Sequence, residues 1–213
     1  MLVEALLKAL PNSTIIGEES ASENRELTEY TWIIDPLDGT TNYLHGLPVF
    51  SISVALLHNG EPVLGIVDCP VLKERFTAVK GEGAFLNGNR IRVSDNGELK
   101  DSLLATGFPY HNFAEMQAYI DVLTHFIQNT RGLRRMGSAA IDLAYTACGR
   151  FDAFFELNLS PWDIAAGILL VTEAGGRVST FNGKESVVFE NQILASSTQL
   201  YPNMTKVLQS SFK

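Results

Sequence analysis

The sequence has few of the features that mark a secreted, membrane-spanning or nucleic-acid-binding protein. It holds two cysteines, Cys69 and Cys148, so we expect no disulfide framework and two reduced thiols. No hydrophobic run is long enough to span a bilayer, and the first residues lack the basic start of a signal peptide. The net charge of −8 disfavours a nucleic-acid backbone as a partner. We therefore expect a cytoplasmic protein with no membrane or nucleic-acid partner.

Repeats, low-complexity segments and interdomain linkers are also missing. With 46% hydrophobic and 19% charged residues, the 213-residue chain is typical of one globular domain with a sizeable core. Short strand and helix patterns mix without strict alternation, which predicts a layered α/β (α+β) fold with sheets between helices. We divide this single domain, 1–213, into a sheet part at about 1–110 and an α/β part at about 111–213. Strands are expected at 14–16, 31–34, 51–58, 62–67, 75–79, 84–86, 91–93, 103–106, 133–136, 153–157, 178–180 and 193–195, and helices at 2–10, 113–127, 138–148, 161–174 and 198–208.

A stretch near residues 31–42 gives the first chemical signal. Asp35 follows a short apolar, β-favouring run, and the proline after it interrupts strand pairing. Asp38 suits a helix N-cap, and 39–41 can open a helical turn whose free N–H groups would hold a phosphate. Two neighbouring carboxylates repel each other unless a proton or a divalent cation intervenes. For this motif alone, a strand-turn-helix whose aspartates only cap and turn is the favoured interpretation.

Other carboxylates share the same setting, at the end of a strand or the start of a helix. If the strand before Glu18 lies beside the strand before Asp35, their ends lie together, and Asp163 falls in the first turn of a helix. Such a set offers only oxygen ligands, which suit Mg²⁺ or Mn²⁺. Two metals sharing a bridging aspartate would balance the charge, as in phosphoryl transfer. The candidates are Glu18, Asp35, Asp38, Glu156 and Asp163.

Three motifs in order and at matching spacing make the chain similar to the inositol monophosphatase family, over nearly its whole length. This is a superfamily of metal-dependent, lithium-sensitive phosphatases. The motifs are specific for the superfamily and less specific for the ester that is hydrolysed. They are Gly17-Glu18-Glu19, Trp32-Ile33-Ile34-Asp35-Pro36-Leu37-Asp38-Gly39-Thr40-Thr41-Asn42-Tyr43 and Pro161-Trp162-Asp163-Ile164-Ala165-Ala166-Gly167, supported by Arg135-Met136-Gly137-Ser138-Ala139-Ala140 and Glu173-Ala174-Gly175-Gly176.

The resemblance implies two Mg²⁺ sites, with a third ion or Mn²⁺ as alternatives. Glu18, Asp35 and the main-chain carbonyl of Leu37 would hold the first ion. Asp35, Asp38 and Asp163 would hold the second. The structural alternative is that Glu18 is a turn acid and Asp163 a helix cap.

The resemblance also implies roles in catalysis and substrate binding. Glu18 and the Thr40 hydroxyl would orient an attacking water, with Asp35 as the third catalytic residue. The phosphate would lie on the N–H groups of Gly39 and Thr40. Hydroxyls of a polyol would bind Asp38 and Glu156, beside Asp163, while three small residues form the wall of the ring pocket: Gly137, Ser138 and Ala139. A plain capping or surface role is the alternative for Thr40, Ser138 and Glu156.

Family members carry about fifty further residues before the segment that matches Leu2, including a lysine and a Thr-x-x-Asp motif that helps a third metal. We therefore expect the chain to be an N-terminally truncated form of the family domain. The family usually forms homodimers, so a homodimer is expected.

The resemblance predicts Mg²⁺-dependent hydrolysis of a small polyol phosphate monoester, with myo-inositol monophosphate as the first candidate. Fructose 1,6-bisphosphate, histidinol phosphate and nucleotide 3′-phosphates are alternatives with the same chemistry. A hypothesis of another class is a regulatory protein-binding relative with little turnover.

Overall fold

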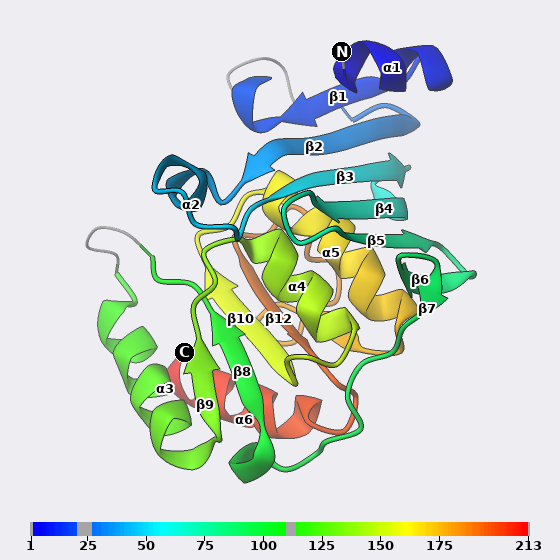
Figure 1. Ribbon diagram of the computed structural model, residues 1–213. Coiled ribbons are helices and arrows are strands. Elements are labelled where there is room, and N and C mark those ends of the chain that lie inside the picture. Colours follow the sequence, from blue (N-terminus) through cyan, green and yellow to red (C-terminus); the bar gives the residue numbers. More distant parts are fainter. Residues whose placement is uncertain (1, 21–26, 110–113, 213) are drawn as a thin grey trace.

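The computed structural model describes residues 2–20, 27–109 and 114–212. Two sheets and the helices around them form successive layers, with α4 and α5 between the sheets and α3 and α6 beneath the second sheet (Figure 1). This confirms the predicted layered α/β sandwich. The helices are α1 (Leu2–Ala9), α2 (Thr40–Leu44), α3 (Met116–Asn129), α4 (Ala139–Ala147), α5 (Pro161–Glu173) and α6 (Tyr201–Ser211), with short 3-10 turns at Glu18–Ser20 and Leu99–Asp101.

The first sheet has seven strands in sequence order. Only β1 and β2 pair in parallel, and the other neighbours are antiparallel. The two-residue turns Asn59-Gly60 and Asn87-Gly88 have positive φ at both positions, as tight hairpins require. The strands are β1 (Thr14–Gly17), β2 (Tyr30–Asp38), β3 (Ser51–His58), β4 (Glu61–Cys69), β5 (Glu74–Val79), β6 (Gly83–Leu86) and β7 (Asn89–Arg90).

The predicted strand at 91–93 is wrong, because β7 lies two residues earlier. The Asn87-Gly88 turn is so tight that the return strand begins at once, with Leu86 paired to Asn89. The chain then leaves the sheet, and the Val93 N–H donates to the carbonyl of Ala174 at the end of α5. The helix expected from Phe113 begins at Met116, and Phe113 lies outside the described residues.

The second sheet mixes parallel and antiparallel pairs. Its order is β11-β12-β10-β8-β9, with β8 parallel to both β10 and β9. The side chains of Tyr119, Phe126 and Phe155 pack with α6 residues on the face that α3 and α6 cover. The strands are β8 (Leu103–Thr106), β9 (Gly132–Arg134), β10 (Ala153–Leu157), β11 (Arg177–Ser179) and β12 (Gln192–Ser196).

The main core fills the space around α4 and α5. Its members come from both sheets and both helices, and they are buried. Glycines allow close packing here: a Cβ at Gly167 of α5 would lie 2.4 Å from Leu143 of α4, and one at Gly65 of β4 would lie 2.8 Å from the Ala166 carbonyl. The two glycines therefore allow α5 to lie close to the sheet and to α4.

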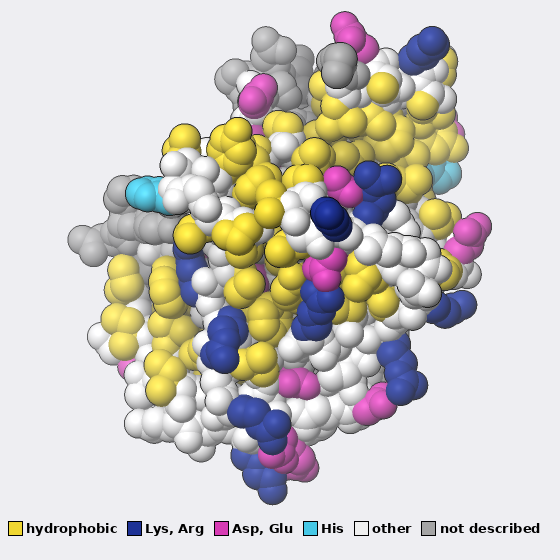
Figure 2. Space-filling model, in the orientation of Figure 1, with side chains coloured by type: hydrophobic (Ala, Val, Ile, Leu, Met, Phe, Trp, Pro, Cys, Tyr) yellow, Lys and Arg dark blue, Asp and Glu magenta, His cyan; other side chains and the backbone are white. Residues whose placement is uncertain are grey.

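The outer face of the first sheet is covered less fully. Trp32, Ile34 and Val54 form a small cluster there, joined by Leu6 of α1 and by Leu10, which follows α1. Hydrophobic side chains gather at this end of the molecule in Figure 2, where α1 itself has no buried residue. None of the helices in the described ranges combines the length and apolar character that a membrane span needs.

Candidate metal centre and adjoining cavity

Three aspartates from two parts of the chain meet where β2 ends and α5 begins. Asp35 and Asp38 come from β2, and Asp163 comes from the first turn of α5. Each offers a carboxylate oxygen, and these oxygens all lie within 4.8 Å of one another. Asp35 is 2% and Asp38 8% exposed, so the cluster is largely withdrawn from solvent.

The Asp35 side chain lies next to an irregularity in the pairing of β2 with β3. Asp35 pairs with Ser53 and Asp38 with Ser51, so the pairing register with β3 shifts between them. A bulge of this kind turns successive side chains away from strict alternation. The Leu37 N–H donates to Asp35 Oδ1 at 2.8 Å, which fixes one oxygen of that carboxylate.

Asp38 does not cap the helix that follows it, and that prediction is wrong. The N-cap of α2 is Gly39, with φ +92° and no side-chain cap. Asp38 instead accepts hydrogen bonds from the Ser138 hydroxyl at 2.5 Å and the Ala140 N–H at 2.9 Å, at the start of α4. The carboxylate therefore joins β2 to α4, a contact between residues about one hundred positions apart.

Asp163 is held by the start of its own helix. The Ser160 N–H donates to Asp163 Oδ2 at 2.7 Å in a capping arrangement. Asp163 is therefore a helix cap, which was the structural alternative to a metal ligand. The same carboxylate also belongs to the acid cluster, so one residue serves both arrangements.

The electrostatics of the cluster call for a cation. Burial is the main cause that raises the pKa of Asp35, of Asp38 and of Asp163 to about 7 each. Repulsion adds to it, because the charge of Asp38 acts on Asp35 and that of Asp163 on Asp38. A divalent cation would relieve both costs. The oxygen-only donor set fits a hard ion such as Mg²⁺, and the three aspartates are the residues that would hold it.

Glu18 lies beside this cluster but outside its tight core. The parallel pairing of β1 with β2 places Gly17 opposite Ile34, so Glu18 follows next to Asp35, as expected for neighbouring strands. Its charge contributes to the raised pKa of both Asp35 and Asp163. The Glu18 side chain is exposed, which puts it on the solvent side of the site.

The start of α2 lies at the same edge. Thr40 is exposed, and its hydroxyl donates to the Leu37 carbonyl at 3.0 Å. The resemblance implies that the Thr40 hydroxyl orients a water and that the Leu37 carbonyl binds a metal ion. In this structure the two groups are hydrogen-bonded to each other. Gly39 is needed as glycine, because its φ is positive and a Cβ there would lie 3.0 Å from the Val49 carbonyl oxygen and 3.2 Å from that of Gly137.

A small cavity of about 130 Å³ opens next to the acid cluster. Asp38 and Asp163 line it, together with four further residues that the sequence proposed for substrate: Gly137, Ser138, Ala139 and Glu156. Ser138 caps α4, since its hydroxyl accepts from the Ile141 N–H at 3.3 Å. Burial, together with the charges of Asp38 and Asp163, raises the pKa of Glu156 to about 8. The structure therefore brings these four residues together with Asp38 and Asp163, whereas Gly39 and Thr40, the other two predicted for the substrate, do not line this cavity.

The cavity has three further lining residues of interest that the sequence did not single out as site residues. Gly107 leaves room for Glu156, since a Cβ there would lie 1.7 Å from Glu156 Oε1. Arg135, which the sequence left undecided, supplies positive charge that lowers the pKa of Glu156. Asp142 lies on α4 and is 1% exposed. A lone acid within the apolar run of α4 was the signal for Asp142.

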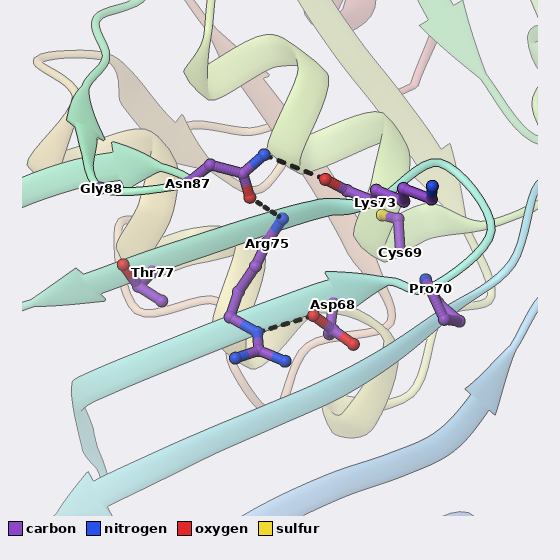
Figure 3. Close-up of a pocket in the computed structure, with 8 residues that line it drawn as sticks. All are labelled: Asp68, Cys69, Pro70, Lys73, Arg75, Thr77, Asn87 and Gly88. Atoms are coloured by element: carbon purple, nitrogen blue, oxygen red, sulfur yellow. Dashed lines mark hydrogen bonds and ion pairs between the residues drawn. The ribbon is translucent and has the colours of Figure 1, made fainter.

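A second cavity, of about 480 Å³, lies away from the acid cluster between β4, β5 and β6 (Figure 3). Its charged and amide groups are largely engaged by the protein itself. Arg75 is paired with Asp68 at 2.7 Å, and the Asn87 side chain bridges the Arg75 N–H and the Lys73 carbonyl. It holds no cluster of acids, so the smaller cavity is the stronger candidate site.

Comparison with known proteins gives a consistent result. A model of the inositol monophosphatase family matches residues 1–212. The chain is 46% identical to a putative Nus factor SuhB of Neisseria meningitidis serogroup B, covering 99% of this chain and 80% of that protein. It is 42% identical to a fructose-1,6-bisphosphatase/inositol-1-monophosphatase of Thermotoga maritima, covering 98% and 78%. A solved inositol monophosphatase of an Anabaena (Nostoc) species superposes with a TM-score of 0.90 at 40% identity, covering 98% and 83%.

Proposed function

The chain belongs to the inositol monophosphatase family of phosphoric monoester hydrolases, and from that premise we propose that it hydrolyses a small polyol phosphate with the help of Mg²⁺. The observation that carries the proposal is the convergence of Asp35, Asp38 and Asp163 beside a polar cavity. Myo-inositol monophosphate is the proposed substrate. A cavity of about 130 Å³ is small against typical ligand pockets of about 300 Å³ or more, which favours a single ring over a nucleotide.

The aspartates are the proposed metal ligands, with Glu18 and the Leu37 carbonyl completing the set on the solvent side. Bound Mg²⁺ would supply Lewis acidity toward the phosphoryl group. A buried, preorganised set of carboxylates holds such an ion without rearrangement, because hydrogen bonds from Leu37, Ser160 and α4 already fix the three side chains.

The remaining residues bind and orient the substrate in this proposal. Gly39 and Thr40 offer backbone N–H groups to the phosphate, while Glu18 and the Thr40 hydroxyl orient the attacking water. Both side chains are exposed, so water can reach them. Glu156, facing the cavity over Gly107, accepts hydrogen bonds from hydroxyls of the leaving group.

The test is phosphate release from inositol 1-phosphate, measured with Mg²⁺, with a chelator and with added Li⁺. We expect turnover that needs Mg²⁺, that Li⁺ inhibits and that Asp35→Asn abolishes. Turnover in the chelator, or full activity of Asp35→Asn, would reject the proposal. A panel with fructose 1,6-bisphosphate, histidinol phosphate and a nucleotide 3′-phosphate identifies the preferred ester. Gel filtration with light scattering tests the proposed homodimer.

A second candidate function is regulation through a partner protein. The Neisseria relative is named a putative Nus factor, and a Pseudomonas aeruginosa relative that is 44% identical is named a Nus factor. With a net charge of −8, this chain would favour a partner with a basic surface. Capture of the same partner by wild type and by Asp35→Asn would support this function. A fully active enzyme that retains no partner would speak against it.

A further inference from the structure

Asp142 is a buried acid in the wall of the small cavity beside the three aspartates. It lies on α4, and its side chain is 1% exposed while lining the cavity. Asp142 Oδ1 has no hydrogen-bond partner within the described part of the chain. A buried polar atom without a partner costs stability, so its presence needs an explanation.

A structural role accounts for only part of this placement. Asp142 lies in the first turn of α4, where the helix dipole favours an acid. That benefit does not require the carboxylate to be buried. The same end of α4 already has an N-cap in Ser138 and an external acceptor in Asp38. Asp142 is therefore surplus to the capping of its helix.

The surroundings show which chemical group would satisfy Asp142. The cavity is lined by the carboxylates of Asp38, Asp142, Glu156 and Asp163, with Arg135 as a cation. Burial raises the pKa of Asp142 well above its usual value, and the charges of Glu156 and Asp38 raise it further. An anionic group would meet several acids here. A neutral hydroxyl can donate to a carboxylate or accept from a carboxylic acid, so it suits either protonation state.

We propose that Asp142 is a specificity-determining residue that hydrogen-bonds a hydroxyl of the substrate's leaving group within this cavity. This inference rests on the proposed polyol phosphatase function. Asp142 and Glu156 would then contact two different hydroxyls, and Gly107, Gly137 and Ala139 provide the space between them. The site would thereby select esters of polyhydroxylated alcohols over esters of simple alcohols. Sites that bind a substrate hydroxyl discriminate strongly against analogues that lack it.

The experiment compares two substrates, inositol 1-phosphate and phenyl phosphate, whose leaving group has no further hydroxyl. We expect Asp142→Ala to lower the ratio of their kcat/KM values, inositol over phenyl, by about tenfold or more. Asp142→Asn has nearly the same shape and hydrogen-bonding capacity, and should keep the ratio within about threefold. Asp121→Ala, which removes an exposed acid from α3, is the matched control and should leave the ratio unchanged.

Urea unfolding distinguishes specificity from a structural role. Since Oδ1 is unpartnered, Asp142→Ala should not lower the free energy of unfolding. A ratio unchanged by Asp142→Ala, or an equal loss on both substrates together with lower stability, would overturn the inference. If wild type releases phosphate from neither ester, the proposed function fails. Calorimetric binding of inositol 1-phosphate, with Ca²⁺ as the ion, then decides the inference by whether Asp142→Ala weakens binding.

Discussion

Asp35→Asn should make the metal-free protein more stable, although it removes a proposed metal ligand. In the folded protein, burial and the charges of Asp38 and Glu18 raise the pKa of Asp35 from 3.8 to about 7. The folded state therefore binds this proton more tightly than the unfolded chain does. Asp35 therefore contributes most to the free energy of unfolding below about pH 4. This contribution falls as the pH rises from about 4 to about 7, and above about pH 7 it no longer changes.

The size of the effect follows from the shift. The pKa of Asp35 rises by about 3, and each pKa unit corresponds to about 1.4 kcal/mol. Ionised Asp35 can therefore lower the free energy of unfolding by at most about 4 kcal/mol above pH 7. An asparagine oxygen can still accept the Leu37 N–H, and its amide can donate to the neighbouring aspartates. Burying the amide keeps part of the cost, so we expect a gain of about 1 to 3 kcal/mol.

Urea denaturation at about pH 5 and about pH 8, with chelator and with Mg²⁺, measures this directly. In chelator, the advantage of Asp35→Asn should grow from the lower to the higher pH. With Mg²⁺ at about one thousand times Kd the order should reverse, because wild type gains about 4.1 kcal/mol, more than the expected advantage of the variant, and the variant gains far less. Asp121→Asn, a change at an exposed acid, should show neither effect. A variant no more stable than wild type at about pH 8 in chelator would refute the reasoning.

Three further predictions concern the packing around the site. Gly107→Ala would place a Cβ 1.7 Å from Glu156 Oε1 and displace that side chain. The kcat/KM for inositol 1-phosphate should therefore fall about tenfold, and an unchanged value would contradict the proposed role of Glu156. Gly167→Ala would crowd α4 and lower the free energy of unfolding by about 1 to 3 kcal/mol, measured in urea; no change would mean that α4 and α5 can separate at little cost. Burial raises the pKa of Cys69 to about 12, so in a Cys148→Ser background a thiol reagent at about pH 8 should label it only as fast as the protein unfolds.

Much of the fold could be predicted because its signals are local. Asparagine-glycine turns fix hairpins, and the apolar run at 51–58 is β3 with the same bounds. Ser138 marks the start of α4, and Pro161-Trp162-Asp163 marks the start of α5, each from its own sequence neighbourhood. The strand expected at 91–93 was misplaced because the tightness of a turn, rather than hydrophobicity, decides where the return strand begins.

Site residues could be predicted where the pairing of neighbouring strands alone determines which side chains lie close together. Glu18 could be placed beside Asp35 by assuming that their strands are neighbours, which the β1–β2 pairing confirms. Asp38 was assigned to the wrong helix, because the bulge in β2 turns its side chain toward α4, and no local pattern encodes that contact. Asp142 could not be connected to the cavity from sequence, because the packing of α4 between the sheets determines what its buried face meets.

The acid cluster joins an early strand to a late helix of the same chain. Asp35 and Asp38 precede Asp163 by most of the polypeptide's length, and α5 reaches them only once it is packed against β4 through Gly65. A proteolytic fragment that stops short of α5 would keep the Asp35–Asp38 pair but could not assemble the three-carboxylate set. Cation affinity would then be a property of the fully assembled molecule, so a cation titration would count native chains in a partly digested or partly folded sample.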